Sequence, residues 1–159
     1  MKKILLALTV AFACQAAFAA EPWEADAKKF EADFWSSQCD QKKLTSLFSD
    51  HFDYVHDDIG ITNGRSGMLD LIRGICAIPG LKIRREEIPG TVHYFPLRDI
   101  RSKHGEIYGV IVSGEHEFLE SENGAPEAPR SRGHFTHLLT IENGQWVVSQ
   151  IMDYGNQRL

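Results

Sequence analysis

The chain has 159 residues, of which 43% are hydrophobic and 25% are charged. This composition is typical of one globular domain and excludes a disordered or collagen-like chain. Asp and Glu together (22) outnumber Lys and Arg (17), so the formal net charge is -5. A chain of this charge offers no basic surface for phosphate groups, and we expect no nucleic-acid partner.

The N-terminus is typical of a secretory signal peptide. A basic MKK segment precedes an apolar run over residues 4–14, and the AFA sequence over residues 17–19 is a small-x-small cleavage site. An apolar run of this length is too short to cross the membrane, which needs about 20 residues, so we expect no membrane span. Phe12 stands where a lipoprotein needs a small residue before Cys14, which leaves lipid anchoring as a minor alternative.

We therefore predict a signal peptide over residues 1–19 and a single domain over residues 20–159. Cleavage near Ala19 places the mature protein in the periplasm or outside the cell. It also leaves two cysteines, Cys39 and Cys76, and an even number in an oxidising compartment indicates one disulfide. The alternative is two separate buried thiols. The wide spacing of the pair does not fit a structural zinc site.

Three helices are predicted in the first half of the mature chain. Residues 22–37 place apolar side chains on one face, after a Pro in the first turn. Asp40 is a suitable N-cap for a second, shorter helix. A strand with alternating apolar and polar residues is predicted over residues 52–57, and Asp58-Ile59-Gly60 offers a turn into a short partner strand. A third helix begins near Asn63 or Gly64 and ends at the Pro-Gly pair at 79–80.

The second half of the chain has the pattern of strands. Pro89-Gly90 indicates a bend within one long strand, and Asn143-Gly144 is a strong hairpin signal. Residues 121–132 contain two prolines and predict a mobile hairpin loop. The predicted strands cover residues 81–88, 91–100, 106–119, 134–142 and 145–154.

These elements predict an α+β fold in which a strongly curved antiparallel sheet wraps around the three N-terminal helices. Long bent strands enclose more space than three helices fill, so we expect a cone with a pocket at its wide end.

The chain contains seven His residues, and strand parity sorts them. His56, His116 and His137 each lie on the more apolar face of their strands, so all three can converge inside the cone. Imidazoles in an apolar pocket can act as hydrogen-bond donors or as general bases. The alternative, for each one separately, is a hydrogen-bonded histidine of the core. We place Asp58 and Tyr154 at the mouth of the pocket.

Two other groups of polar residues have alternative interpretations. Arg84 and Glu86 share one face of a strand, and Arg85 and Glu87 share the other. Either pair can line the pocket, where an Arg binds a carboxylate, or lie on a solvated outer face. The histidines lack the close spacing of a three-His metal centre, so we expect no metal and no cofactor.

Several segments together resemble the nuclear transport factor 2-like superfamily, within it the SnoaL-like branch. They are the DHFDYVH segment over residues 50–56, Gly60 with the helix that follows it, the HFTHL segment over residues 134–138 and the ENGQWVV hairpin over residues 142–148. The resemblance covers residues 23–154, almost the whole mature chain. It implies a cone-shaped α+β barrel with a ligand pocket between sheet and helices, often paired as a homodimer through the outer face of the sheet.

The resemblance implies little about chemistry, because the fold carries many activities. Our leading hypothesis is an exported protein that binds a small hydrophobic molecule in a His-lined pocket, with acid–base chemistry of the isomerase, dehydratase or cyclase kind. The alternative is a non-catalytic assembly or partner-binding module that acts through the outer face of the sheet. The sequence leaves open whether the protein is an enzyme.

Overall fold

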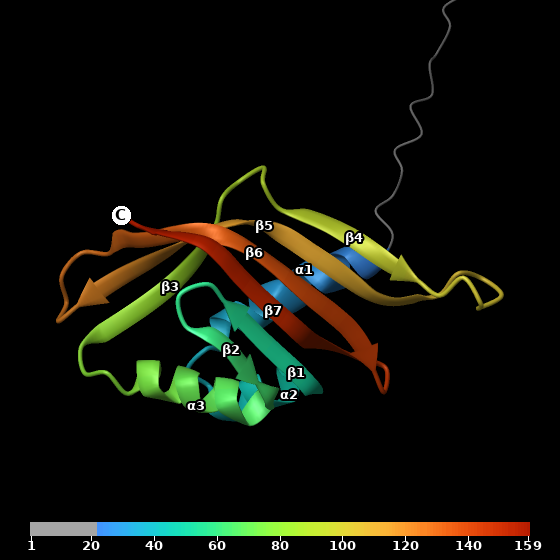
Figure 1. The fold of residues 1–159 in the computed structure, drawn as a ribbon, viewed down its shortest axis with the longest axis horizontal. Helices are drawn as coiled ribbons and strands as arrows, with labels where there is room; N and C mark the ends of the chain where they lie inside the picture. The colour runs from blue at the N-terminus through green and yellow to red at the C-terminus, as the bar shows by residue number, and fades with distance from the viewer. Residues whose placement is uncertain (1–21) are drawn as a thin grey trace, which may run out of the picture.

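The computed structural model describes residues 22–159, so the predicted signal peptide lies outside the described residues. Within these residues three helices and seven strands follow one another, and the sheet arches over the helices (Figure 1). The α+β class is therefore confirmed. The helices are α1 (Pro22–Ser36), α2 (Gln41–Leu47) and α3 (Gly64–Cys76). The strands are β1 (Phe48–His56), β2 (Gly60–Asn63), β3 (Leu81–Glu87), β4 (His93–Arg98), β5 (Ile107–Glu122), β6 (Ala128–Glu142) and β7 (Gln145–Arg158).

The sheet is mixed, which corrects the prediction of a purely antiparallel one. Its strand order is β2-β1-β7-β6-β5-β3, and β4 also pairs with β5. The pair β1 and β7 is parallel, with Tyr54 opposite Ile151, while the other pairs are antiparallel. The β1–β2 hairpin comes before α3 in the chain and joins the sheet beside the last strand, so local turn signals do not specify its direction. Within residues 22–159 the sheet is strongly curved but does not close.

Helix α1 packs into the core through one apolar face, and this face also contains a buried carboxylate. Ala27, Phe30 and Phe34 are buried at helical spacing, and Glu31 is buried among them. The second helix has Asp40 as its N-cap, as predicted, and the Asp40 side chain accepts the N–H of Lys43. None of the helices within residues 22–159 has the length and apolar character that a membrane crossing requires.

At one edge of the sheet, the long strand β5 pairs with two shorter strands, β3 and β4. Both β3 and β4 pair with it, so residues 81–98 run along one long strand with the bend at Pro89-Gly90 that the sequence predicts. The predicted loop over residues 121–132 is mostly wrong. Strand β5 continues to Glu122 and β6 begins at Ala128. Pro129 is accommodated there beside a shift in register, where a missing N–H interrupts the ladder least.

A disulfide joins Cys39 to Cys76, which confirms the predicted pairing. Cys39 follows α1 and Cys76 ends α3, so the bond ties these two helices together beneath the sheet. Both cysteines line the internal cavity described below.

Removing this bond is expected to lower the free energy of unfolding by about 2–4 kcal/mol. The crosslink restricts the unfolded chain over a separation of 37 residues. Urea unfolding of the Cys39→Ser/Cys76→Ser protein checks this value, and the reduced wild type should match the variant. Equal midpoints for oxidised, reduced and substituted protein would contradict it.

Candidate functional site

A cavity of about 520 Å³ lies between α1, α3 and the inner face of the sheet. Most of its wall is apolar, because helical spacing on α3 and alternation on the strands direct aliphatic and aromatic side chains inward. Three polar side chains from β1 and β7, Tyr54, His56 and Asp153, interrupt this wall. The apolar wall includes Phe34, Trp35, Met68, Leu71, Ile72, Ile75, Ile83, Phe118 and Ile151.

Asp153 and Tyr54 form a buried hydrogen-bonded pair in the cavity wall. The Tyr54 hydroxyl donates to Asp153 Oδ2 over 3.1 Å, while buried Oδ1 has no partner among residues 22–159. Burial raises the pKa of Asp153 above its usual range, although His137, Tyr54 and Arg85 act in the opposite direction. Burial and the neighbouring carboxylate also raise the pKa of Tyr54. Tyr54 is therefore a hydrogen-bond donor at neutral pH, and Asp153 can take up a proton.

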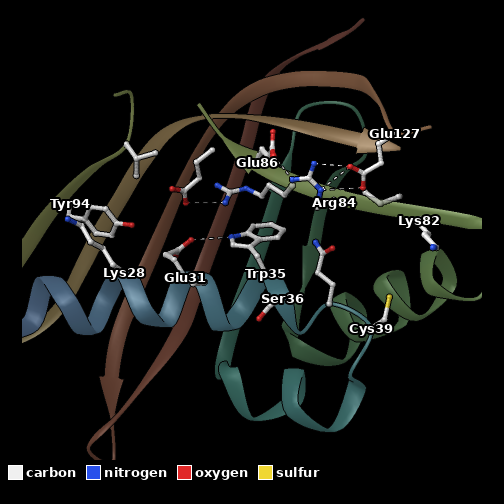
Figure 2. A pocket seen from close by; sticks show the side chains of 16 residues that line it. Lys28, Glu31, Trp35, Ser36, Cys39, Lys82, Arg84, Glu86, Tyr94 and Glu127 are labelled. Atoms are coloured by element: carbon white, nitrogen blue, oxygen red, sulfur yellow. Dashed lines mark hydrogen bonds and ion pairs between the residues drawn. The ribbon is translucent and has the colours of Figure 1, made fainter. Parts of the chain in front are cut away.

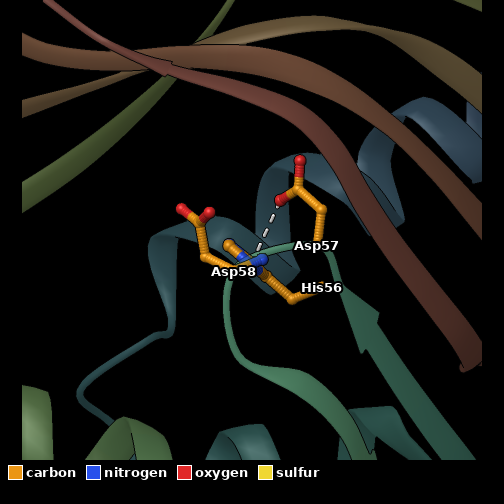
Figure 3. Close-up of side chains that lie close together, drawn as sticks. All are labelled: His56, Asp57 and Asp58. Carbon is orange, nitrogen blue, oxygen red and sulfur yellow. Dashed lines mark hydrogen bonds and ion pairs between the residues drawn. The ribbon is translucent and has the colours of Figure 1, made fainter.

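His56 lies beside Asp153 across the parallel β1–β7 pair. Its Nδ1 accepts the backbone N–H of Asp58 over 3.0 Å, so the ring proton is on Nε2 in this arrangement. Figure 3 shows His56 with Asp57 and Asp58, three residues close enough for a shared cation. However, Asp58 N–H occupies His56 Nδ1, and Asn156 donates twice to the Asp57 carboxylate. These bonds hold His56 and Asp57 in place within the cluster.

His116 and Arg85 form a second buried pair on β5 and β3. The Arg85 Nε–H donates to His116 Nδ1 over 2.9 Å, which places the His116 ring proton on Nε2. Burial lowers the pKa of His116 to about 3, and the positive charge of Arg85 adds to this effect. His116 is therefore a neutral donor at physiological pH. It cannot be a base through Nδ1, because Arg85 occupies that atom.

His137 and Glu31 form the third buried pair, between β6 and α1. Both carboxylate oxygens of Glu31 lie 3.0 Å from His137 Nδ1, and Trp35 Nε1–H donates to Glu31 over 3.1 Å. Burial alone would raise the pKa of Glu31, but His137 and Arg85 more than offset it, so this pKa is lowered. A charged carboxylate thus holds the His137 ring in place.

A wider cleft of about 1040 Å³ opens between α1 and the strands β3 and β4. Figure 2 shows Trp35 and Glu31 rising from α1 toward β3, with Arg84 bound to Glu127 on the far side. Both charged pairs of β3 line this cleft, but only Arg85 has a buried side chain, whereas Glu87 is partly exposed and Arg84 and Glu86 are exposed.

The structure places the five predicted pocket residues in three different surroundings. His56 lines the cavity. Asp58 lines a small polar depression next to the cavity, and four residues line both spaces: His56, Phe118, Glu120 and Ser131. His116 and His137 are fully buried on either side of the Phe135 ring. Tyr154 is 45% exposed and stacks on His134, away from the cavity lining.

Four further residues belong to the same interior: Glu31, Tyr54, Arg85 and Asp153. Each had a signal in the sequence, because each is a polar residue at an apolar position of its element. Glu31 lies within the apolar face of α1, and Asp153 follows Ile151 at the spacing of one strand face. Polar residues at such positions mark candidate sites as well as the histidines do.

Comparison with solved structures shows that this chain has the cystatin-like fold of several other proteins, one of which is described as NTF2-like. An NTF2-like protein with a cystatin-like fold from Novosphingobium aromaticivorans is 9% identical, covering 82% of this chain and 79% of its own, with a TM-score of 0.58. Hexachlorocyclohexane dehydrochlorinase LinA-type3 from Novosphingobium barchaimii is 16% identical, covering 86% and 90%, with a TM-score of 0.60. A putative calcium/calmodulin dependent protein kinase II association domain from Xanthomonas campestris is 11% identical, covering 94% and 96%, with a TM-score of 0.61.

These similar structures include both an enzyme and an association domain, so the shared fold does not decide between the two hypotheses. No protein-family model matches the sequence, and no curated protein matches it. The function is therefore argued from the site itself.

Proposed function

We propose that this chain binds a small, largely apolar molecule in the internal cavity and performs acid–base chemistry on it. The observation that carries the proposal is the Asp153 carboxylate, which lines an apolar cavity with one oxygen free of partners. An assembly module needs no such cavity. A buried carboxylate with a raised pKa is a suitable general base near neutral pH.

The geometry supports proton abstraction next to a carbonyl group. Asp153 Oδ1 takes the proton from the carbon atom, and the electron pair of the C–H bond moves to the carbonyl oxygen as an enolate. His56 Nε2–H, on the paired strand, supplies a donor for that oxygen. Tyr54 orients the base by its bond to Oδ2, which leaves Oδ1 for the substrate.

His116 and His137 act in this proposal from behind the cavity wall. Each holds one ring nitrogen against a charged partner, Arg85 or Glu31, and each has a buried Nε2 without a partner among residues 22–159. They contribute polarity to the end of the cavity where Asp153 lies. His137 and Arg85 both act electrostatically on the Asp153 carboxyl group, which supports this placement.

Export and pairing are part of the same proposal. The disulfide is compatible with an oxidising compartment, which supports a periplasmic or secreted location after signal-peptide cleavage near Ala19. Phe95 and Tyr154 are exposed apolar side chains on strands of the sheet, and they support a homodimer formed through its outer face. Neither export nor dimer formation requires a change in the internal cavity.

Filling the cavity is expected to remove ligand binding without unfolding the protein. N-phenyl-1-naphthylamine, a neutral apolar fluorophore, is expected to bind the wild type and to lose at least tenfold in affinity in Leu71→Trp. Leu71 is a partly buried residue of the cavity wall. Ile78→Trp is the matched control, because Ile78 follows α3 and is exposed outside the lining. Equal affinity in both variants, or no binding by the wild type, would contradict the proposal.

A further inference from the structure

Arg85 is a buried cation whose hydrogen-bonding capacity is not used up within the protein. Its side chain is 2% exposed, and the guanidinium lies between the rings of Trp35 and Phe135, at 4.3 and 4.2 Å from their centroids. Nε–H donates to His116, and Nη1 contacts Glu87 at 3.3 Å, a long bond to a carboxylate with 36% exposure. Buried Nη2 has no acceptor among residues 22–159.

We propose that the ligand is an amphipathic oxyanion of the carboxylate or sulfonate type, whose anionic group binds Arg85 in the cleft while its apolar body fills the internal cavity. This inference rests on the proposed function, because it names the class of molecule that the cavity takes. Two aromatic rings pack against the guanidinium, and its Nε–H and Nη1–H groups already face His116 and Glu87, so Nη2 is the donor left for a ligand. An oxygen atom of a carboxylate or sulfonate can accept a charge-assisted hydrogen bond from it.

The cleft and the cavity lie next to each other and share part of their lining. Trp35, Cys39, Lys82 and Ile83 line both spaces. Ile83 and Arg85 are two positions apart on the same face of β3, so the apolar wall of the cavity leads directly to the cation. One elongated ligand can therefore contact Ile83 with its apolar part and Arg85 with its charged end.

The carboxylates of the cleft already face cations of the protein. Glu31 binds His137, Glu87 contacts Arg85, and Glu86 and Glu127 bind Arg84 (Figure 2). Lys82, at the junction of the two spaces, has no close ion-pair partner within residues 22–159, although Glu127 lies near enough for the two charges to interact. The donors that remain for an anion are therefore Lys82 Nζ and Arg85 Nη2.

Two fluorescent probes that differ by one anionic group test the inference. N-phenyl-1-naphthylamine is neutral, and 8-anilino-1-naphthalenesulfonate has the same rings with a sulfonate. We expect the wild type to bind the sulfonate at least tenfold more tightly. Arg85→Met should remove this preference while leaving the affinity for the neutral probe within about twofold. Arg73→Met is the control, because Arg73 is an exposed arginine on α3 that lines neither the cleft nor the cavity.

A second variant keeps the test decisive if Arg85→Met does not fold. Lys82→Met changes an accessible side chain at the junction and should lower the affinity for the sulfonate about threefold without affecting the neutral probe. Equal binding of the two probes by the wild type would overturn the inference and leave the proposed function standing. A preference for the sulfonate that persists in both Arg85→Met and Lys82→Met would also overturn it. Failure of both probes to bind would overturn the proposed function as well.

Discussion

Replacing Asp153 with asparagine is expected to slow proton exchange at the α-carbon of 2-tetralone by about 100- to 10,000-fold, the usual contribution of a general base. Asparagine keeps the shape of the side chain and an oxygen that accepts the Tyr54 hydroxyl, but it cannot take up a proton. The measurement is the incorporation of deuterium from D₂O, followed by NMR at saturating ketone.

The matched control for this variant is Asp53→Asn. Asp53 is exposed on β1 and alternates with the inward residues Phe52 and Tyr54. A raised pKa means that folding favours protonated Asp153, so its contribution to stability is lost as the pH rises through that pKa. Asp153→Asn should therefore unfold no more easily than the wild type at neutral pH. Exchange that is equally fast in Asp153→Asn and Asp53→Asn would exclude Asp153 as the base.

Truncation of Glu31 to alanine is expected to lower the free energy of unfolding by about 3–5 kcal/mol, the range for breaking a buried charged pair on one side. The change leaves His137 Nδ1 and Trp35 Nε1 without their shared acceptor in the core. Glu31→Gln retains an acceptor oxygen and should lose less. Urea unfolding at neutral pH measures both values.

A surface carboxylate on the same helix is the control for Glu31. Glu24 pairs only with Lys28, in an exposed ion pair, and its removal should cost no more than about 1 kcal/mol. The lowered pKa of Glu31 fixes the sign of the pH dependence: its stabilisation is present above its ordinary pKa and is lost as the pH falls through the lower value of the folded state. The difference between wild type and Glu31→Gln should shrink on acidification. A constant difference would show that the Glu31 charge does not stabilise the fold.

Local patterns in the sequence predict most of the fold, because each depends on neighbouring residues. Helical spacing identifies α1 and α3, Asp40 caps α2, and the Asn143-Gly144 turn has both residues at positive φ, as a tight hairpin requires. The parallel contact between β1 and β7 has no such local signal. It depends on how the finished sheet curves, and the prediction of a purely antiparallel sheet failed there.

The candidate site is predictable by residue type but not by pairing. Parity predicts that His116 and His137 point inward, and both side chains are buried in the structure. Their partners come from other elements: Arg85 lies 31 residues before His116, and Glu31 lies 106 residues before His137. Because these pairs decide which nitrogen carries a proton, the base and the donors emerge only from the folded arrangement.

The most direct test of the central claim is a ¹³C NMR titration of the Asp153 side-chain carboxyl, with and without N-phenyl-1-naphthylamine. Our account predicts a pKa above the ordinary range for aspartate, and a further rise when the apolar probe fills the cavity that Asp153 lines. An ordinary or lowered pKa that does not respond to the probe would contradict the claim that Asp153 is a buried base in a ligand cavity.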